Sequence, residues 1–78
     1  MRKKEKKVIV TFENTTEAMA MESICRKYAV NGRLIPVPRE ITSGCGMAWC
    51  SDIEYKNELL DFIRLKNICH EAVYEVDF

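Results

Sequence analysis

The middle of the chain reads IPVPREITSGCG over residues 35–46. This stretch holds both prolines of the chain, two of its three glycines, and Cys45 between those glycines. Because proline has no backbone N–H, the start of the stretch can pair only at the edge of a sheet. The residue patterns predict a strand and a helix before this stretch, and a strand, a helix and a strand after it. The fold is therefore expected to present residues 38–46 as a loop, with Cys45 as its reactive group.

The composition is that of one small soluble domain covering residues 1–78. The chain is 47% hydrophobic and 31% charged, and its 12 basic and 12 acidic residues cancel. A balanced charge provides no field that would attract nucleic acid or an anionic membrane. Residues 1–6 are predicted to be a frayed basic N-terminus. No apolar run approaches the roughly 18 residues of a membrane span, and no signal peptide is recognisable, so a cytoplasmic location is expected.

The first half of the chain predicts a buried strand followed by an amphipathic helix. Residues 7–12 are β-branched and aromatic, as in a central strand that is buried on both faces. Asn14 and Glu17 have the spacing of a capping box, and residues 31–32 (Asn-Gly) are expected to end the helix. Apolar residues recur at helical spacing along one stripe, where Cys25 is predicted to be a core residue: Ala18, Met21, Ile24, Cys25 and Tyr28.

The second half predicts two short strands, a helix and a last strand. Residues 33–38 form an edge strand, and residues 47–50 return as its partner. Ser51 and Glu54 suggest a second capping box, opening a helix over about residues 52–66. Its apolar stripe is Tyr55, Leu59, Phe62 and Ile63, and Asn67 ends it. In the last strand an alternating set is expected to face the core: Ala72, Tyr74, Val76 and Phe78.

The order of elements is β-α-β-β-α-β. It predicts an α+β fold of the ferredoxin-like kind, an antiparallel sheet in the order 4-1-3-2 with both helices on one face. A three-stranded sheet, without the proline-rich segment, is the alternative. In the four-stranded arrangement one rim is expected to collect the following residues: Asn14 to Thr16, Cys45, Asn67, Cys69 and His70.

Several neighbours of Cys45 are expected to make its thiol reactive. Gly44 and Gly46 expose the sulfur and free backbone N–H groups that can converge on an anion. Arg39 supplies a permanent positive charge in the same loop, and His70 is a candidate proton relay. The alternatives remain that Cys45 is only a small residue in a tight turn, that His70 is a surface histidine, and that Cys69 is a packing residue.

The cysteines do not have the spacing of a metal site. Cys45, Cys50, Cys69 and His70 lack the paired C-x2-C knuckles of structural zinc. Adjacent residues on a strand, such as Cys69 and His70, also point to opposite faces. The sequence has no phosphate-binding loop and no nucleophile elbow. We therefore expect no metal and no cofactor.

Three segments resemble a small bacterial family of selenium or sulfur carrier-like proteins: residues 12–18, residues 33–41 (R-L-I-P-V-P-R-E-I) and residues 43–46 (S-G-C-G). The resemblance implies that Cys45 takes up sulfur or selenium from a donor protein and passes it to an acceptor protein. Thr42 and Ser43 would then hydrogen-bond the anion that Arg39 and the glycine amides stabilise. Better-understood sulfur carriers of this size place their cysteine in a Cys-Pro motif that opens a helix, whereas Cys45-Gly46 opens a strand.

Two other functions stay open. One is a non-catalytic regulatory module that binds a small anion or a protein partner at the same rim. The other is a thiol-redox protein in which Cys69 resolves a disulfide formed by Cys45, which requires Cα atoms within about 4 to 7 Å of each other. A carrier or binding protein is favoured over a turnover enzyme. The last strand, at an edge of the sheet, leaves homodimerisation open.

Overall fold

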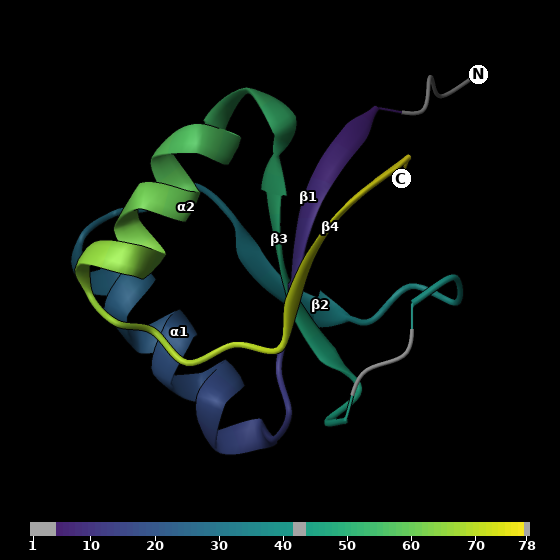
Figure 1. Ribbon diagram of the computed structural model, residues 1–78, viewed down its shortest axis with the longest axis horizontal. Coiled ribbons are helices and arrows are strands. Elements are labelled where there is room, and N and C mark those ends of the chain that lie inside the picture. Colours follow the sequence, from purple (N-terminus) through teal and green to yellow (C-terminus); the bar gives the residue numbers. More distant parts are fainter. Residues whose placement is uncertain (1–4, 42–43, 78) are drawn as a thin grey trace.

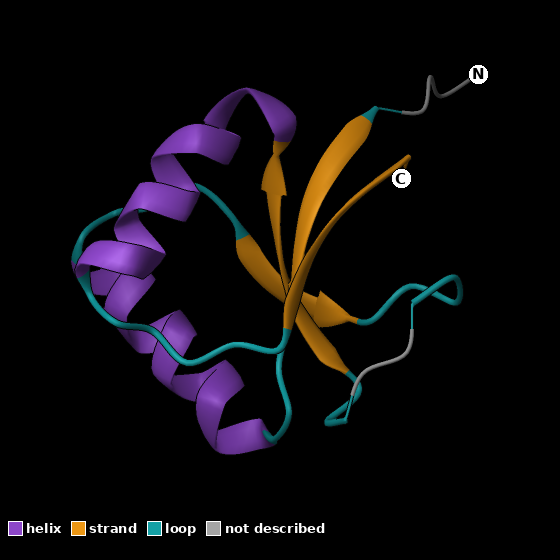
Figure 2. Ribbon diagram, viewed as in Figure 1, coloured by secondary structure: helices purple, strands orange, loops and turns teal. Residues whose placement is uncertain are grey.

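The computed structural model describes residues 5–41 and 44–77. The fold is α+β, with a four-stranded antiparallel sheet and two helices that lie together on one side of it (Figures 1 and 2). In chain order the elements are β1 (Lys6–Thr11), α1 (Thr15–Lys27), β2 (Arg33–Pro36), β3 (Met47–Asp52), a short 3-10 turn η1 (Ile53–Tyr55), α2 (Lys56–Leu65) and β4 (Ala72–Asp77).

The strands lie in the order β2-β3-β1-β4, and every neighbouring pair is antiparallel. Read from the opposite edge, this is the order 4-1-3-2. The proline-bearing strand β2 lies at an edge, as the missing proline N–H groups require. It pairs with β3 along its whole length, from Arg33 to Pro36, so the three-stranded alternative is wrong.

Strand β1 is buried on both faces, as predicted. Val8, Ile9 and Val10 are all fully buried. Alternation along the strand sends Val8, Val10 and Phe12 into the core beneath the helices, whereas Ile9 belongs to a second apolar cluster on the other face. The core on the helix side also contains the buried residues of both helices and one tryptophan: Ala18, Met21, Cys25, Trp49, Leu59 and Ile63.

The face of the sheet opposite the helices is covered by a turn rather than by a third helix. The backbone N–H of Ile41 donates to the carbonyl of Pro38 at 3.0 Å, which closes a turn over residues 38–41. Pro38 and Ile41 are both buried, and Ile41 packs with Ile9 and Ala48. The proline-rich stretch therefore forms a lid over part of this face. Because no helix of the described residues covers it, the sheet face opposite the two helices is called the open face below.

Helix α1 begins where the sequence predicted but ends earlier. The Asn14 side chain accepts from the N–H of Glu17 at 2.9 Å, as a capping residue does. At the other end Ala29 adopts φ 55°, and the N–H of Val30 donates to the carbonyl of Cys25 at 2.9 Å. This is a Schellman motif, so the predicted stop at residues 31–32 is wrong. The early stop leaves Tyr28 48% exposed instead of in the core.

Helix α2 begins later than predicted and ends as predicted. Ser51 belongs to β3 and donates its hydroxyl to Asn31, so the predicted capping box of Ser51 and Glu54 is wrong. The turn η1 precedes the helix, which starts at Lys56. Asn67 has φ 52° and ends the helix in the role usually taken by glycine.

Strand β4 buries only part of the face that the sequence predicted, because Val76 packs against the open-face cluster and Tyr74 does not. Tyr74 lies on the open face and is 40% exposed, whereas Val73 packs on the helix side. The apolar cluster on the open face is formed by residues of β1, β2, β3 and the lid, and Val76 is the β4 residue that packs against it. Phe78, the last residue of the predicted set, lies outside the described residues.

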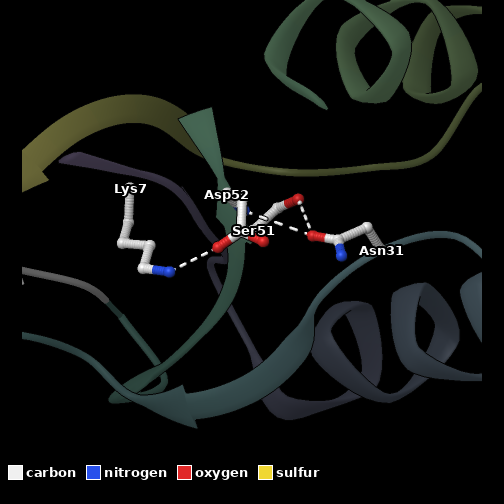
Figure 3. A network of polar contacts seen from close by, with 4 residues as sticks. All are labelled: Lys7, Asn31, Ser51 and Asp52. Carbon is white, nitrogen blue, oxygen red and sulfur yellow. Dashed lines mark hydrogen bonds and ion pairs between the residues drawn. The ribbon is translucent and has the colours of Figure 1, made fainter. Parts of the chain in front are cut away.

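Asn31 ties the α1–β2 connection to the end of β3 (Figure 3). Its side-chain oxygen accepts from the Ser51 hydroxyl at 2.9 Å and from the N–H of Asp52 at 3.2 Å. Its backbone carbonyl accepts from the indole N–H of Trp49 at 3.3 Å. Asp52 also forms an ion pair with Lys7, and this bond raises the pKa of the lysine above its usual value. The Asn31 side chain thus joins the α1–β2 connection to β3, and Asp52 in turn joins β3 to β1.

We predict that Asn31→Ala lowers the free energy of unfolding by about 1–3 kcal/mol, because the buried Ser51 hydroxyl loses its acceptor. Urea denaturation followed by circular dichroism measures the change. Asn57→Ala is the control, since Asn57 is an exposed residue of α2. Equal effects of the two substitutions would show that the Asn31 bonds do not stabilise the fold.

A second prediction follows from the burial of Cys25, which raises the pKa of its thiol to about 11. In the unfolded chain this thiol ionises near its ordinary pKa of 9.0. As the pH rises above that value, the unfolded state is stabilised relative to the folded state, and the free energy of unfolding falls. Wild type should therefore lose about 2 kcal/mol more than Cys25→Val between pH 9 and pH 11. Urea midpoints at several pH values test this, and parallel curves for the two proteins would contradict it.

Candidate functional site

Cys45 lies in the short segment that leads into β3. The N–H of Val37 donates to the carbonyl of Gly46 at 2.9 Å, so the pairing of β2 with β3 continues past the ends of both strands. The Cys45 side chain is half-buried and packs against the core on the helix side. Its thiol lies 3.5 Å from the backbone carbonyl of Met47, to which it donates a weak hydrogen bond. The core contacts and the hydrogen bond to Met47 therefore fix the position of the sulfur, and the residue stays partly exposed.

The two glycines beside Cys45 are required for different reasons. A side chain at Gly44 would place its Cβ 2.4 Å from the carbonyl oxygen of Glu13, so this glycine allows the loop to lie directly on the turn between β1 and α1. Gly46 has φ 75°, which favours glycine, but a Cβ there would meet no atom within 4 Å. Gly44 thus fixes the position of the Cys45 segment, and Gly46 fixes the path of its backbone.

The four cysteines are all free and fall into two classes. Cys25 and Cys50 are buried, and burial raises the pKa of both thiols. For Cys50 the positive charges of Lys7 and Arg33 oppose the effect of burial. Cys45 is half-buried and Cys69 is exposed. An external reagent can therefore reach Cys45 and Cys69 in the folded chain, and the other two thiols are protected.

Cys69 and His70 lie beside the end of β1, on the side of β4, whereas the Cys45 segment leads into β3 on the opposite side of β1. The N–H of Glu71 donates to the carbonyl of Thr11 at 2.7 Å, which holds this segment against β1. The Nδ1 atom of His70 lies 3.1 Å from the carbonyl of Ile68. Because a carbonyl only accepts, Nδ1 carries the hydrogen and Nε2 is left to exchange protons. In the described part of the chain no hydrogen bond joins His70 to Cys45.

Asn67 does not share this rim, contrary to the prediction from topology. The ammonium group of Lys66 lies 4.2 Å from the ring centroid of Tyr28, which caps the C-terminal end of α1. The C-terminal ends of both helices therefore meet, and the chain then crosses back to reach β4 (Figure 1). Asn67 directly follows the C-terminal end of α2 and so lies at the start of this crossing.

Arg39 and Cys45 belong to parts of the loop that pack on opposite faces of the sheet. Arg39 is exposed at the corner of the residue 38–41 turn, which covers the open face. Cys45 packs on the helix side. The described structure shows no contact between the two side chains. Thr42 and Ser43, which connect the two parts, lie outside the described residues.

Two further groups at the site are backbone atoms, which leave no signal in the sequence. They are the carbonyl of Glu13, which contacts Gly44, and the carbonyl of Met47, which accepts from the thiol. Over residues 5–41 and 44–77 no group of three or more His, Cys, Asp or Glu side chains could hold a metal ion. Over the same residues no helix has the length and apolar character needed to cross a membrane.

We predict that Gly44→Ala costs about 1–3 kcal/mol of folding free energy, because the loop must move off the Glu13 carbonyl. Gly46→Ala is the matched control, and its left-handed backbone should cost only about 1 kcal/mol. Urea denaturation gives both values, and the alkylation rate of Cys45 reports whether the segment has moved. If Gly44→Ala is the milder substitution, the contact with Glu13 does not hold the loop.

One of three comparisons with known proteins gives a match. Neither the comparison with curated proteins nor that with solved structures gives a match. The sequence matches a family described as "Putative Se/S carrier protein-like" over residues 7–75, a range that includes every described element except the ends of β1 and β4. The chain therefore belongs to this family of Se/S carrier-like proteins.

Proposed function

We propose that the protein carries sulfur or selenium as a persulfide, or the corresponding selenium adduct, on Cys45. The Cys45 thiolate attacks the outer sulfur of a persulfide on a donor protein. A bond forms between Sγ and that sulfur, the S–S bond of the donor breaks, and the donor cysteine leaves as a thiolate. A nucleophile on the acceptor protein then takes the outer sulfur, and the Cys45 thiolate leaves. No external oxidant or reductant is needed.

The observation that carries this proposal is the placement of Cys45. Its side chain is held between two glycines, reaches the surface, and lies in a chain of a carrier-like family. Of the other thiols, Cys25 and Cys50 are too buried to exchange a group with another protein. Transfer also requires the weak bond from the thiol to the Met47 carbonyl to break, since a carbonyl cannot donate to a thiolate.

Supporting roles are proposed for the remaining residues of the loop and the rim. The amides flanking Gly44 and Gly46 would stabilise the anion, and Nε2 of His70 would accept the thiol proton, directly or through water. Arg39, together with Thr42 and Ser43, would act on the approaching donor rather than on a resting thiol. We also propose a ferredoxin-like classification for the fold and a cytoplasmic location, where free thiols persist.

A thiol-redox function is the second candidate, because the accessible Cys69 flanks the same end of β1 as Cys45. In this reaction a disulfide of another protein is reduced. Cys45 first forms a mixed disulfide with it, and Cys69 then displaces the substrate thiolate to give a Cys45–Cys69 disulfide. The carrier reaction leaves Cys69 unchanged, and this difference separates the two functions.

We predict that incubation with a persulfide donor, a small-molecule persulfide or a persulfidated desulfurase, adds the mass of one sulfur atom to Cys45. Peptide mass spectrometry locates the addition. Cys69→Ser should load and release sulfur like wild type, whereas Cys45→Ser should load at least about tenfold less.

Three outcomes would go against the carrier function. Loading on Cys69 alone would reassign the carrier residue. A Cys45–Cys69 disulfide that cycles in wild type and is lost in Cys69→Ser would establish the redox function. An unmodified Cys45, with an alkylation rate no faster than that of Cys69, would leave the non-catalytic binding module as the better function for this rim.

A further inference from the structure

The end of the molecule away from Cys45 contains a cleft of about 450 Å³. It lies between the C-terminal end of α1 and the first turns of α2, and the end of β3 forms part of its floor. Three aromatic and three polar residues give it its chemical character: Tyr28, Tyr55, Phe62, Asn31, Ser51 and Glu58. None of these residues takes part in the proposed carrier site.

The ring of Tyr28 already lies against two ammonium groups of the chain itself. Lys66 and Lys27 place their ammonium nitrogens 4.2 and 5.6 Å from the ring centroid of Tyr28. Phe62 meets Tyr28 edge to face, with ring centroids 5.6 Å apart. Neither lysine belongs to the cleft lining. An aromatic ring face attracts cations through its quadrupole, so partly exposed Tyr28 and Tyr55 favour a cationic ligand between them.

The polar groups of the cleft include donors and acceptors, since the Asn31 side chain accepts two hydrogen bonds through its oxygen and can still donate through its nitrogen. The hydroxyl of Ser51, which is 2% exposed, gives its only hydrogen to the side-chain oxygen of Asn31. Towards a ligand its oxygen can therefore only accept. Glu58 is an exposed carboxylate that has no ion-pair partner among the described residues. The carbonyl end of α1 adds partial negative charge on the same side, and the N-terminal end of α2, whose first turn holds Glu58, adds partial positive charge beside it.

We propose that this cleft binds a small organic ammonium ion with an aromatic or apolar stem. The stem packs against Leu59 and Phe62, the ammonium group donates to Glu58, and the tyrosine rings flank the charge. A carboxylate or phosphate ligand would meet the Glu58 carboxylate, so anions are disfavoured. This binding site is independent of Cys45 and of the proposed sulfur transfer.

The test uses 2-phenylethylammonium as the probe, titrated into the ¹⁵N-labelled full chain and followed by amide chemical shifts. We expect shifts centred on Asn31, Ser51 and Glu58, with a Kd of about 1 mM for a ligand of this size. The neutral 2-phenylethanol should bind at least about fivefold more weakly, since it lacks the charge-assisted bond. The anionic 3-phenylpropionate should not bind.

Glu58→Gln and Glu54→Gln form a matched pair of variants, because both glutamates are exposed and only Glu58 lines the cleft. Glu58→Gln should raise the Kd of the ammonium probe about tenfold, and Glu54→Gln should leave it unchanged. The proposal is overturned if the alcohol binds as well as the ammonium ion, if the two variants behave alike, or if the shifts lie elsewhere. Persulfide loading of Cys45 is unaffected by any of these results.

Discussion

The rest of the structure depends on the burial of β1 on both faces. A central strand with Val8, Val10 and Ile9 fully buried needs apolar cover on each side of the sheet. The two helices supply one cover, and the turn over residues 38–41 supplies the other. The proline-rich stretch is therefore first a structural lid, with Pro38 and Ile41 buried in it. The chain then passes to the other side of the sheet, where Cys45 packs. The loop that carries Cys45 is held because both of its described parts contribute to a core.

Local patterns predict the fold well wherever short-range chemistry decides it. Asn14 caps one helix and Asn67 ends the other, and both positions could be recognised from residues within one turn. Long-range contacts decide the remainder. Ser51 is a good capping residue by type, but its hydroxyl bonds Asn31, which lies twenty residues away in the chain. Alternation in β4 separates two faces, but it does not show that Val76 packs against the open-face cluster while Tyr74, on the same face, is exposed.

The candidate site was predicted in part for the same reason. Topology alone places the Cys45 segment, Cys69 and His70 near the end of β1, and the contacts of Glu13 and Thr11 agree with this. Topology does not give the inclination of α2, whose C-terminal end meets that of α1, so Asn67 falls outside the rim. Proximity in sequence also misleads for Arg39. The two residues are six positions apart in the chain, but the turn that carries Arg39 covers the open face, whereas Cys45 packs on the helix side.

Strand β3 connects the two chemically distinct ends of the molecule. Met47, at its start, offers the carbonyl that holds the Cys45 thiol, and Ser51, near its end, forms part of the ammonium cleft. A ligand in the cleft could influence the thiol only by moving this strand. However, β3 is paired with β2 on one side and with β1 on the other, and the Asn31 bonds fix its end. A strand constrained in this way transmits little displacement, so sulfur transfer and cation binding are expected to act independently.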